Sequence, residues 1–375
     1  MGVGDVDPLP GEGEVVVAVA GVGAAIDKPG TGSKPDGLRL FGAESPNEQK
    51  VTDEEIRTFY SCLFRANLFS RKFYERDAEG NPYYYSPYDG KVHAGYMYTD
   101  NGFWDTFRSQ FPLTNILHPT MQGRYMNALL AAQEQCGWLP SWSAPGETGG
   151  MIGNHAISLL TDAWAKGIRT FDPQKALEAY AKEAMNKGPW GGANGRAGWK
   201  EYWQLGYVSY PESMGSTAQT LEYAYDDYCI AQAARALGKE EDYDYFLRRS
   251  LSYRNLIDPE TKFMRGRDSQ GRWRTPFTPV AYQGPGSVHG WGDITEGFTL
   301  QYTWYVPHDV AGHIDRVGRR LYETRLDSLF VTELPDDIPG AHDIQGRIGA
   351  YWHGNEPCHN IVYLYNYRIV DSKGR

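Results

Sequence analysis

The stretch STAQTLEYAYDDYCIAQAARALG, residues 216–238, carries the clearest helical signal in the sequence. Its apolar and small side chains recur at spacings of three and four, which places them on one stripe of an α-helix. The stripe consists of Leu221, Ala224, Tyr225, Tyr228, Ala231 and Ala234. Gly238 closes the pattern, because glycine readily adopts the left-handed conformation in which many helices end. We therefore predict one long helix over these residues.

Comparable helical signals lie on both sides of this stretch. Thr52 and Glu55 form a capping box that begins a helix running to about Leu68. Thr120 is expected to cap a helix that ends at Gly137. Further helical patterns lie near residues 102–112, 152–166, 172–188, 240–256, 296–305, 318–330 and 357–366. Strand patterns are scarce after residue 50, so an all-α main domain is predicted, either an (α/α) barrel or an irregular bundle of helices.

The first 50 residues are expected to lie outside the helical domain. Residues 15–26 are rich in valine and bounded by glycine and proline, which indicates a strand or two left from a preceding β-domain. Residues 27–50 have the composition of a linker. We therefore divide the chain into a β-domain remnant with linker, residues 1–50, and a main domain, residues 51–375. The N-terminus has no basic segment typical of a signal peptide, and its apolar run is too short for a membrane span.

The composition limits the classes of partner. A net charge of -10 opposes binding to nucleic acid and to anionic lipid, because both repel an acidic protein. The chain has 27 tyrosines and 11 tryptophans, whose rings can stack on a sugar while their polar atoms bond its hydroxyls. Carbohydrate is therefore the favoured ligand class from the overall excess of rings, although any single ring belongs more often to the core.

The segment HGWGDITEGFTLQYTWYVPHD, residues 289–309, combines polar and aromatic residues where a helix is expected to begin. Thr295 is a candidate helix cap, which would leave Glu296 in the first turn with a lowered pKa. Exclusion of water by neighbouring rings would instead raise the pKa of Glu296 and keep the acid protonated. The rings concerned are Trp291, Phe298 and Trp304. A protonated carboxyl suits a glycosidase, which must protonate a leaving sugar oxygen, but a simple capping carboxylate is the alternative.

The segment YWHGNEPCHNIVYLYNY, residues 351–367, gathers His353, Asn355, Glu356 and His359 within seven residues. Amide and carboxylate oxygens are hard ligands that suit calcium. The two histidines do not have the i, i+4 spacing of a helical zinc site. Ordinary helix capping at Pro357 is the alternative for these residues.

The segment FWDTFRSQFPL, residues 103–113, places Asp105 and Arg108 three apart beside Trp104. On a helix this spacing brings the carboxylate and the guanidinium onto one face. The two side chains are then available either to form a structural salt bridge or to bind hydroxyl groups.

The segment MIGNHAISLLTDAWAKG, residues 151–167, supplies Asn154 and His155 on another expected helix. A histidine in such a position is more often a semi-buried ring with satisfied hydrogen bonds than a catalyst.

Together, several strings resemble the α-mannosidases of glycoside hydrolase family 92 in their order and approximate spacing. The strings are WDTFR, GNH, TDAWAKG, STAQTLEYAYDD, TEG, QYTWYVPHD and HGNEP, spread over about residues 50–367. The resemblance implies an (α/α)6 barrel that normally follows a β-sandwich domain. It also implies calcium-dependent hydrolysis of terminal α-linked mannose from mannosides or N-glycans, with inversion. Relatives are mainly exported by bacteria, which implies a secreted or periplasmic protein.

The resemblance assigns roles to individual residues. Glu296 falls on the general acid of the family, and Asn355 and Glu356 match its Ca2+ motif. Residues that align with strings holding the terminal mannose are Trp104, Asp105, Arg108, Asn154, His155 and His353.

The chain departs from the family pattern in two places. The family continues with a G-N-D/E-D string whose acidic residues supply the general base, and this string is absent here. We therefore expect a barrel domain incomplete at its C-terminus, in a chain truncated at both ends, that is poorly soluble and nearly inactive by itself. The second departure is Asn360, which stands where the family usually has a second adjacent histidine.

Two alternatives remain open from the sequence. A non-catalytic mannose-binding protein would keep the pocket without the base. Another sugar-active enzyme on an (α/α) toroid would need a catalytic pair within this chain, such as Asp293 with Glu296 or with Asp309.

Overall fold

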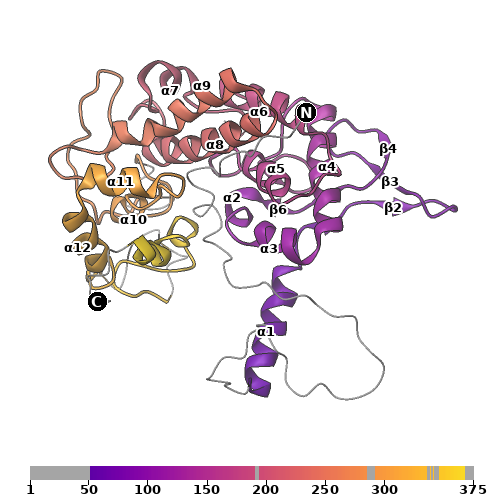
Figure 1. Cartoon of the computed structure of the whole chain (residues 1–375), viewed down its shortest axis with the longest axis horizontal. Helices are drawn as coiled ribbons and strands as arrows, with labels where there is room; N and C mark the ends of the chain where they lie inside the picture. The colour runs from indigo at the N-terminus through magenta and orange to yellow at the C-terminus, as the bar shows by residue number, and fades with distance from the viewer. Residues whose placement is uncertain are drawn as a thin grey trace, which may run out of the picture.

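The computed structural model of the chain describes residues 51–190, 194–284, 292–335, 338, 341 and 346–367. It is rich in helices and has a few very small sheets (Figure 1). The predicted β-domain remnant and linker, residues 1–50, lie outside the described residues.

The N-terminal part begins with a helix that projects from the body of the molecule and continues with short strands (Figure 1). Its elements are α1 (Asp53–Ala66), β1 (Arg71–Lys72), β2 (Glu75–Arg76), β3 (Pro82–Tyr85), β4 (Val92–Ala94), β5 (Tyr98–Thr99), β6 (Asn101–Gly102), α2 (Phe103–Thr106), α3 (Gln110–Leu117), α4 (Pro119–Cys136) and β7 (Trp142–Ser143). The pairs β1 with β5 and β6 with β7, and the three strands β2, β3 and β4, form antiparallel sheets. All of these strands have two to four residues.

The middle of the chain packs around one long helix, α8 (Ser216–Ala236). Its neighbours are α5 (Ala156–Ala165), α6 (Pro173–Met185), α7 (Trp199–Leu205), α9 (Glu240–Ser250) and the 3-10 helix η2 (Leu251–Leu256). Helices α5, α6, α9 and η2 contact α8 directly. Because α8 is surrounded, most of its residues are buried, including the acidic Glu222, Asp226 and Asp227.

The C-terminal part forms the opposite side of the molecule from α2–α5 (Figure 1). It contains α10 (Thr299–Tyr302), α11 (Val310–Val317), α12 (Arg319–Leu329) and the 3-10 helices η3 (Glu356–Cys358) and η4 (Ile361–Tyr367). A second apolar cluster, separate from that around α4 to α6, joins α11 and α12 to the segment around Trp352 and Cys358.

The strongest local signals in the sequence are confirmed. Thr52 and Glu55 form the predicted capping box, with Glu55 N–H bonded to Thr52 Oγ1 at 3.2 Å and Thr52 N–H bonded to Glu55 Oε2 at 2.7 Å. Gly137 ends α4 in the left-handed conformation. Thr120 is not the cap of that helix, because the helix begins one residue earlier, at Pro119, and Thr120 already lies within it. The helices over 199–205 and 310–317 were not predicted, nor were the short strands between residues 71 and 143.

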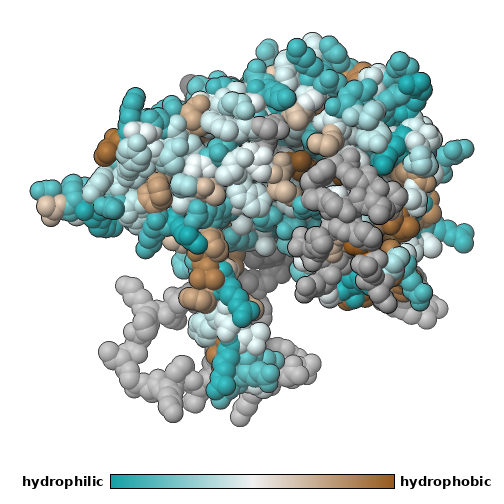
Figure 2. Space-filling view, turned by 180° about the vertical axis from the view of Figure 1, so that it is seen from behind, coloured by the Kyte–Doolittle hydropathy of each residue, from teal (hydrophilic) through white to brown (hydrophobic). Residues whose placement is uncertain are grey.

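Helix α1 contributes none of its side chains to the core of the described residues. Its exposed apolar side chains include Phe59, Tyr60 and Phe64. In Figure 2 the same helix projects below the body, with brown apolar atoms among its teal polar ones. None of the helices among the described residues combines the length and apolar character needed to cross a membrane.

Candidate functional site

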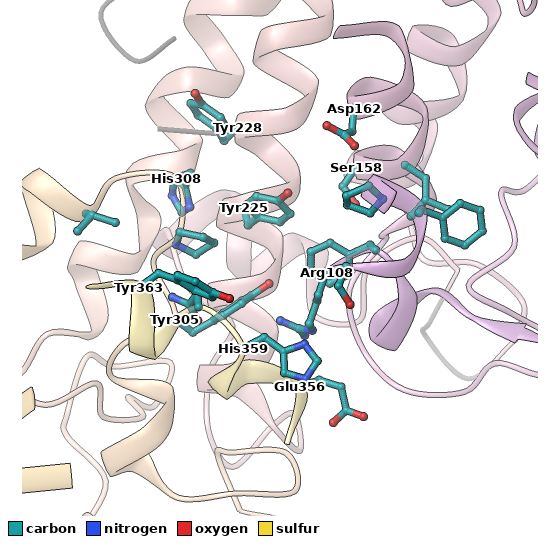
Figure 3. A pocket seen from close by; sticks show the side chains of 18 of the residues that line it. Arg108, Ser158, Asp162, Tyr225, Tyr228, Tyr305, His308, Glu356, His359 and Tyr363 are labelled. Atoms are coloured by element: carbon teal, nitrogen blue, oxygen red, sulfur yellow. The ribbon is translucent and has the colours of Figure 1, made fainter. Parts of the chain in front are cut away.

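A cavity of about 320 Å³ lies between the N-terminal and C-terminal sides of the molecule, with part of α8 in its wall. Figure 3 shows Tyr225 and Tyr228 reaching it from α8, and His359 and Glu356 from the C-terminal segment. Arg108 enters from the N-terminal side and points toward His359 and Glu356. Of the residues predicted from sequence, Arg108, His353 and Glu356 line this cavity.

Glu296 lies in an unusual backbone conformation. Its φ of 49° is left-handed, which is uncommon for a residue other than glycine and costs free energy. Hydrogen bonds on both sides hold it there: Tyr302 O–H donates to the carbonyl of Thr295 at 2.5 Å, and Gly297 exchanges two backbone hydrogen bonds with Gln283. The surrounding structure therefore fixes a strained residue, a pattern common at functional sites.

The prediction that Thr295 caps a helix containing Glu296 is wrong. Helix α10 begins only at Thr299, because a left-handed residue cannot belong to a right-handed helix. The predicted ring environment is also different. Phe298 packs on Tyr282 and Trp352, and Trp304 packs on Tyr322 and His313, while Trp291 lies outside the described residues.

Asn355 joins the HGNEP segment to Glu296. Its side-chain Nδ2 donates to the backbone carbonyl of Glu296 at 3.1 Å and approaches Gln301 Oε1 at 3.3 Å. Asn355 also stands at the N-cap position of η3, but its side chain makes no capping hydrogen bond. Ordinary helix capping therefore does not explain this asparagine, which instead connects two segments that are 59 residues apart.

Asp105 and Glu356 bring two carboxyl groups together beside Glu296. Burial is the largest cause that raises the pKa of Asp105 to about 7, and the neighbouring Glu356 contributes through charge repulsion and a hydrogen bond between the two carboxyl groups. Glu296 adds a smaller repulsion, while Arg108 lowers the pKa of Asp105 only in part. Three acidic side chains from distant parts of the chain are therefore close enough to influence one another.

Arg108 does not form the Asp105 salt bridge considered from the sequence; its ion pair is with Glu222 of α8. Arg108 Nη2 lies 3.0 Å from Glu222 Oε1, and Arg108 Nε donates to the Trp104 carbonyl at 3.0 Å. Trp104 is buried, and its indole Nε1 donates to the same Glu222 oxygen at 2.9 Å. Trp104 and Arg108 are thus held by one carboxylate.

Asn154 and His155 lie in the interior, next to α8, and are not among the residues lining the cavity. The backbone N–H of Asn154 donates to Asp226 Oδ2 at 2.8 Å, and its side-chain Nδ2 donates to the carbonyl of Gly195 at 2.7 Å. The His155 ring is 1% exposed and lies between Glu222 and Asp226, with Nε2 3.3 Å from Glu222 Oε2. Their contact with a sugar remains a prediction.

His353 and His359 stack at the cavity wall, with ring centroids 4.9 Å apart. Tyr351 O–H lies 2.6 Å from His353 Nδ1 and fixes the orientation of that ring. Burial, with the nearby charge of Arg108 as a second cause, lowers the pKa of His359 to about 4, so its ring is neutral at physiological pH. Asn360 also faces the cavity and donates to the Trp304 carbonyl at 3.1 Å.

Sequence reasoning did not single out Glu222 or Gln301. Glu222 lies in the long helix with Asp226 and Asp227. Three acids on a helix with an apolar stripe indicate that basic side chains lie in the core to pair with them. Gln301 Oε1 accepts from the Phe298 backbone at 3.3 Å and its Nε2 donates to the Ala350 carbonyl at 3.0 Å. It therefore supports the turn that carries Glu296.

The segments that meet at this site match a known family as one continuous region. Residues 46–373 match the glycosyl hydrolase family 92 catalytic domain. The chain belongs to glycosyl hydrolase family 92. The members of this family are glycoside hydrolases, so the chain is assigned to an enzyme class. The match to the catalytic domain extends over most of the chain.

Solved structures support the assignment. The family GH92 α-mannosidase BT3965 from Bacteroides thetaiotaomicron, in complex with mannoimidazole, is 53% identical with a TM-score of 0.77, over 83% of this chain and 40% of that one. The family GH92 inverting mannosidase BT2199 from Bacteroides thetaiotaomicron VPI-5482 is 44% identical with a TM-score of 0.76, over 84% of this chain and 43% of that one.

A curated relative is more distant. An uncharacterized secreted glycosidase from Arthroderma benhamiae is 26% identical over 296 residues, which are 70% of this chain and 35% of the relative. The chain therefore spans less than half the length of each of these three relatives.

Proposed function

We propose that the protein takes part in hydrolysis of terminal α-linked mannose with inversion at the anomeric carbon, with Glu296 as the general acid. One observation carries this proposal: Glu296, Asn355, Glu356 and Asp105 come from three distant segments and meet beside a cavity. Support comes from one relative named as an α-mannosidase, at 53% identity, and from another named as an inverting mannosidase, at 44% identity.

The proposed role of Glu296 is to give a proton to the glycosidic oxygen as the bond to the leaving sugar breaks. The left-handed backbone fixes the origin of its side chain, so little conformational freedom is lost when a substrate binds. Repulsion from Glu356 and Glu296 favours the protonated form of the neighbouring Asp105. An inverting enzyme also needs a second carboxylate, about 6.5–9.5 Å away, to activate water. Among the described residues we assign only the acid of this pair.

The remaining predicted residues would bind the sugar. Arg108 and His353 at the cavity wall, with the adjacent Asp105, offer hydrogen-bond donors and acceptors that suit hydroxyl groups. The rigid position of Trp104 and Arg108 on Glu222 favours binding with little loss of side-chain entropy. Asn154 and His155 complete the predicted sugar-binding set; both are buried next to α8 and do not line the cavity.

Calcium is the proposed cofactor, and the residues present fit it. Glu356 and Asp105 place two carboxyl groups face to face at the cost of a raised pKa, and a divalent cation relieves that repulsion. Among the described residues no three His, Cys, Asp or Glu side chains are grouped for a metal, so amide oxygens and water must supply further ligands. Asn355 and Glu356 would hold the ion, which when bound would coordinate two sugar hydroxyls and favour distortion of the ring.

The proposal extends to the arrangement of the helices and to the cellular location of the protein. Pairs of helices around α8 are compatible with an (α/α)6 barrel. The curated relative is named as secreted, and we extend that location to this protein.

Another enzyme with a pair drawn from Asp293, Glu296 and Asp309 is not favoured. Asp293 Oδ2 accepts from the Gly266 backbone at 2.7 Å and from Thr217 at 3.1 Å, while its Oδ1 bonds Arg274. Asp309 bonds Tyr253 and Arg254 and caps α11 through the Gly312 N–H. Both carboxylates are therefore occupied by structural partners.

The decisive test measures binding and turnover separately. Mannoimidazole should bind the purified chain with calcium present, and a chelator should weaken that binding. Any mannose that the chain releases from α-1,2, α-1,3, α-1,4 and α-1,6 mannobioses should appear first as β-mannose by NMR. Binding with little turnover is expected if the string that supplies the general base is needed for catalysis, and it is shared with the non-catalytic mannose-binding alternative. No binding of the mannose analogue in the presence of calcium would overturn the proposal.

A further inference from the structure

Glu222 occupies the centre of a buried polar cluster that no assigned role explains. Its carboxylate is 0% exposed and belongs to the middle of α8. One oxygen, Oε1, accepts both from Trp104 Nε1 at 2.9 Å and from Arg108 Nη2 at 3.0 Å. Since both donors belong to the predicted sugar-binding set, a single carboxylate determines where both side chains stand.

The other oxygen of Glu222 lies against a buried histidine ring without a hydrogen bond to it. Oε2 lies 3.3 Å from His155 Nε2, and the opposite ring nitrogen of His155 lies 3.5 Å from Asp226 Oδ1. The His155 ring stacks on Phe107 with centroids 4.0 Å apart. Glu222 therefore cannot rotate away from Trp104 and Arg108 without disturbing a packed histidine.

Arg108 is confined from several directions. Its guanidinium lies over the rings of Phe107 and Tyr305, with its central carbon 4.5 Å and 4.9 Å from the two centroids. Its side chain is only 5% exposed, yet it forms part of the cavity wall. Such a cation is costly to bury without a counter-charge, and Glu222 provides it.

The charges of the wider cluster balance. Asp227, one turn along α8, contacts Arg196 Nη1 at 2.6 Å and Arg249 Nε at 3.1 Å. Glu222 and Asp227 thus pair with three arginines, whereas the partners of Asp226 are the His155 ring and the Asn154 N–H, and the formal charges of the three acids and the three arginines are equal in number. Removing the charge of Glu222 would leave Arg108 unbalanced at the cavity, whereas the ion-pair partners of Asp227, Arg196 and Arg249, do not line the cavity.

We propose that Glu222 is a positioning residue for sugar binding, which holds the indole of Trp104 and the guanidinium of Arg108 in the geometry that receives a neutral hexose. It acts through these two side chains and does not itself touch the sugar. The proposal rests on the proposed mannosidase function, because Trp104 and Arg108 derive their sugar-binding role from it.

The test compares Glu222→Gln with Asp227→Asn in the full chain. Both variants replace a fully buried carboxylate of α8 with an amide of nearly the same shape. Glu222→Gln should weaken binding of methyl α-mannoside about tenfold, because hydrogen bonds to a charged acceptor are roughly twice as strong as neutral ones. Asp227→Asn should lower stability but weaken the affinity of the folded protein less, because Asp227 reaches the predicted sugar-binding set only through Arg196 and Asn154.

A second measurement needs no ligand. The Trp104 indole N–H resonance, assigned by its disappearance in Trp104→Phe, should shift in Glu222→Gln and stay in place in Asp227→Asn. An unmoved resonance or an unchanged affinity in folded Glu222→Gln would overturn the positioning role, as would an equal loss of affinity in both variants. Failure of the unmodified chain to bind methyl α-mannoside would count against the proposed function, and the indole resonance would still decide the role of Glu222.

Discussion

The acids on α8 and the acids beside the cavity show opposite electrostatic designs. Glu222 and Asp227 on the helix each contact arginine at 2.6–3.1 Å, although both are fully buried. At the cavity, Asp105 faces Glu356 and Glu296, and its pKa is raised to about 7. These two acids of α8 are neutralised by arginines, whereas the acids at the cavity are not fully neutralised by any nearby cation among the described residues. The balanced group is suited to holding structure, whereas the unbalanced group is suited to exchanging protons or attracting a cation.

Arg108 lies between the two groups. Its ion pair with Glu222 commits its charge to the helix, so it offsets the repulsion at Asp105 only in part. The cavity acids therefore lack positive charge because the guanidinium of Arg108 neutralises Glu222 on α8. Substitutions of acid by amide should consequently have different effects in the two groups.

The largest effect is expected for Glu296→Gln, which removes the proposed proton donor. General acid catalysis contributes typically about 10²–10⁴-fold in rate, so whatever mannose release the chain shows should fall by that factor while mannoimidazole still binds. Glu240→Gln, an exposed position at the start of α9, is the control and should keep the original rate. A Glu296→Gln protein whose rate stays within threefold of the original would exclude the proposed role.

The next largest effect is expected for Asp227→Asn, which breaks the balanced group. It leaves Arg196 and Arg249 without their shared carboxylate, and removing one partner of a buried ion pair costs about 3–5 kcal/mol. Urea unfolding followed by tryptophan fluorescence measures the loss of unfolding free energy. Asp268→Asn, whose carboxylate pairs with the exposed Arg272, should cost much less. Similar losses in the two variants would contradict the importance of burial.

The helices were predictable from sequence because their signals are local. The capping box at Thr52, the glycine after α4 and the stripe of α8 each lie within a few turns. Glu296 could be selected as a candidate from its motif, but its left-handed backbone could not, because that conformation depends on Gln283, Tyr302 and Asn355. The local sequence predicted Thr295 as a helix cap, but contacts between residues distant in sequence hold Glu296 in a non-helical conformation.

The partner of Arg108 was beyond sequence reasoning for the same reason. The spacing of Asp105 and Arg108 suggested a pair, but Glu222, 114 residues away, is the partner. The strands between residues 71 and 143 have only two to four residues, too few for an alternating pattern to be recognised.

Glu183 extends the comparison to a buried acid without an arginine partner among the ion pairs of the described residues. Burial raises its pKa from the usual 4.5 to about 7, against the opposing effect of hydrogen bonds from the Gly195 and Leu139 N–H groups. Because the folded pKa is the higher one, the stabilising contribution is complete below about pH 4.5 and is lost as pH rises through 7. The shift corresponds to about 3 kcal/mol.

This pH dependence can be isolated by substitution. The free energy of unfolding, measured from pH 4 to 8, should fall less steeply in Glu183→Gln than in the original protein over that window. The absolute stability of the variant is not the readout, since an amide cannot accept both backbone hydrogen bonds. Parallel pH profiles for the two proteins would show that Glu183 is not the group responsible.

The smallest and most discriminating effect is expected at Glu356, where substitution should stabilise rather than destabilise. Glu356→Gln removes the nearest like charge from Asp105, so the calcium-free protein at pH 7 should gain on the order of 1 kcal/mol. Calcium should raise the melting temperature of the original protein, because a ligand that binds only the folded state stabilises it, and this rise should disappear in the variant. Melting curves with chelator and with added calcium measure both effects. Because Asp227→Asn is expected to destabilise the protein, the same chemical change would then have opposite signs in the two groups; a loss of stability at Glu356 without calcium would mean that the cavity acids are balanced by cations after all.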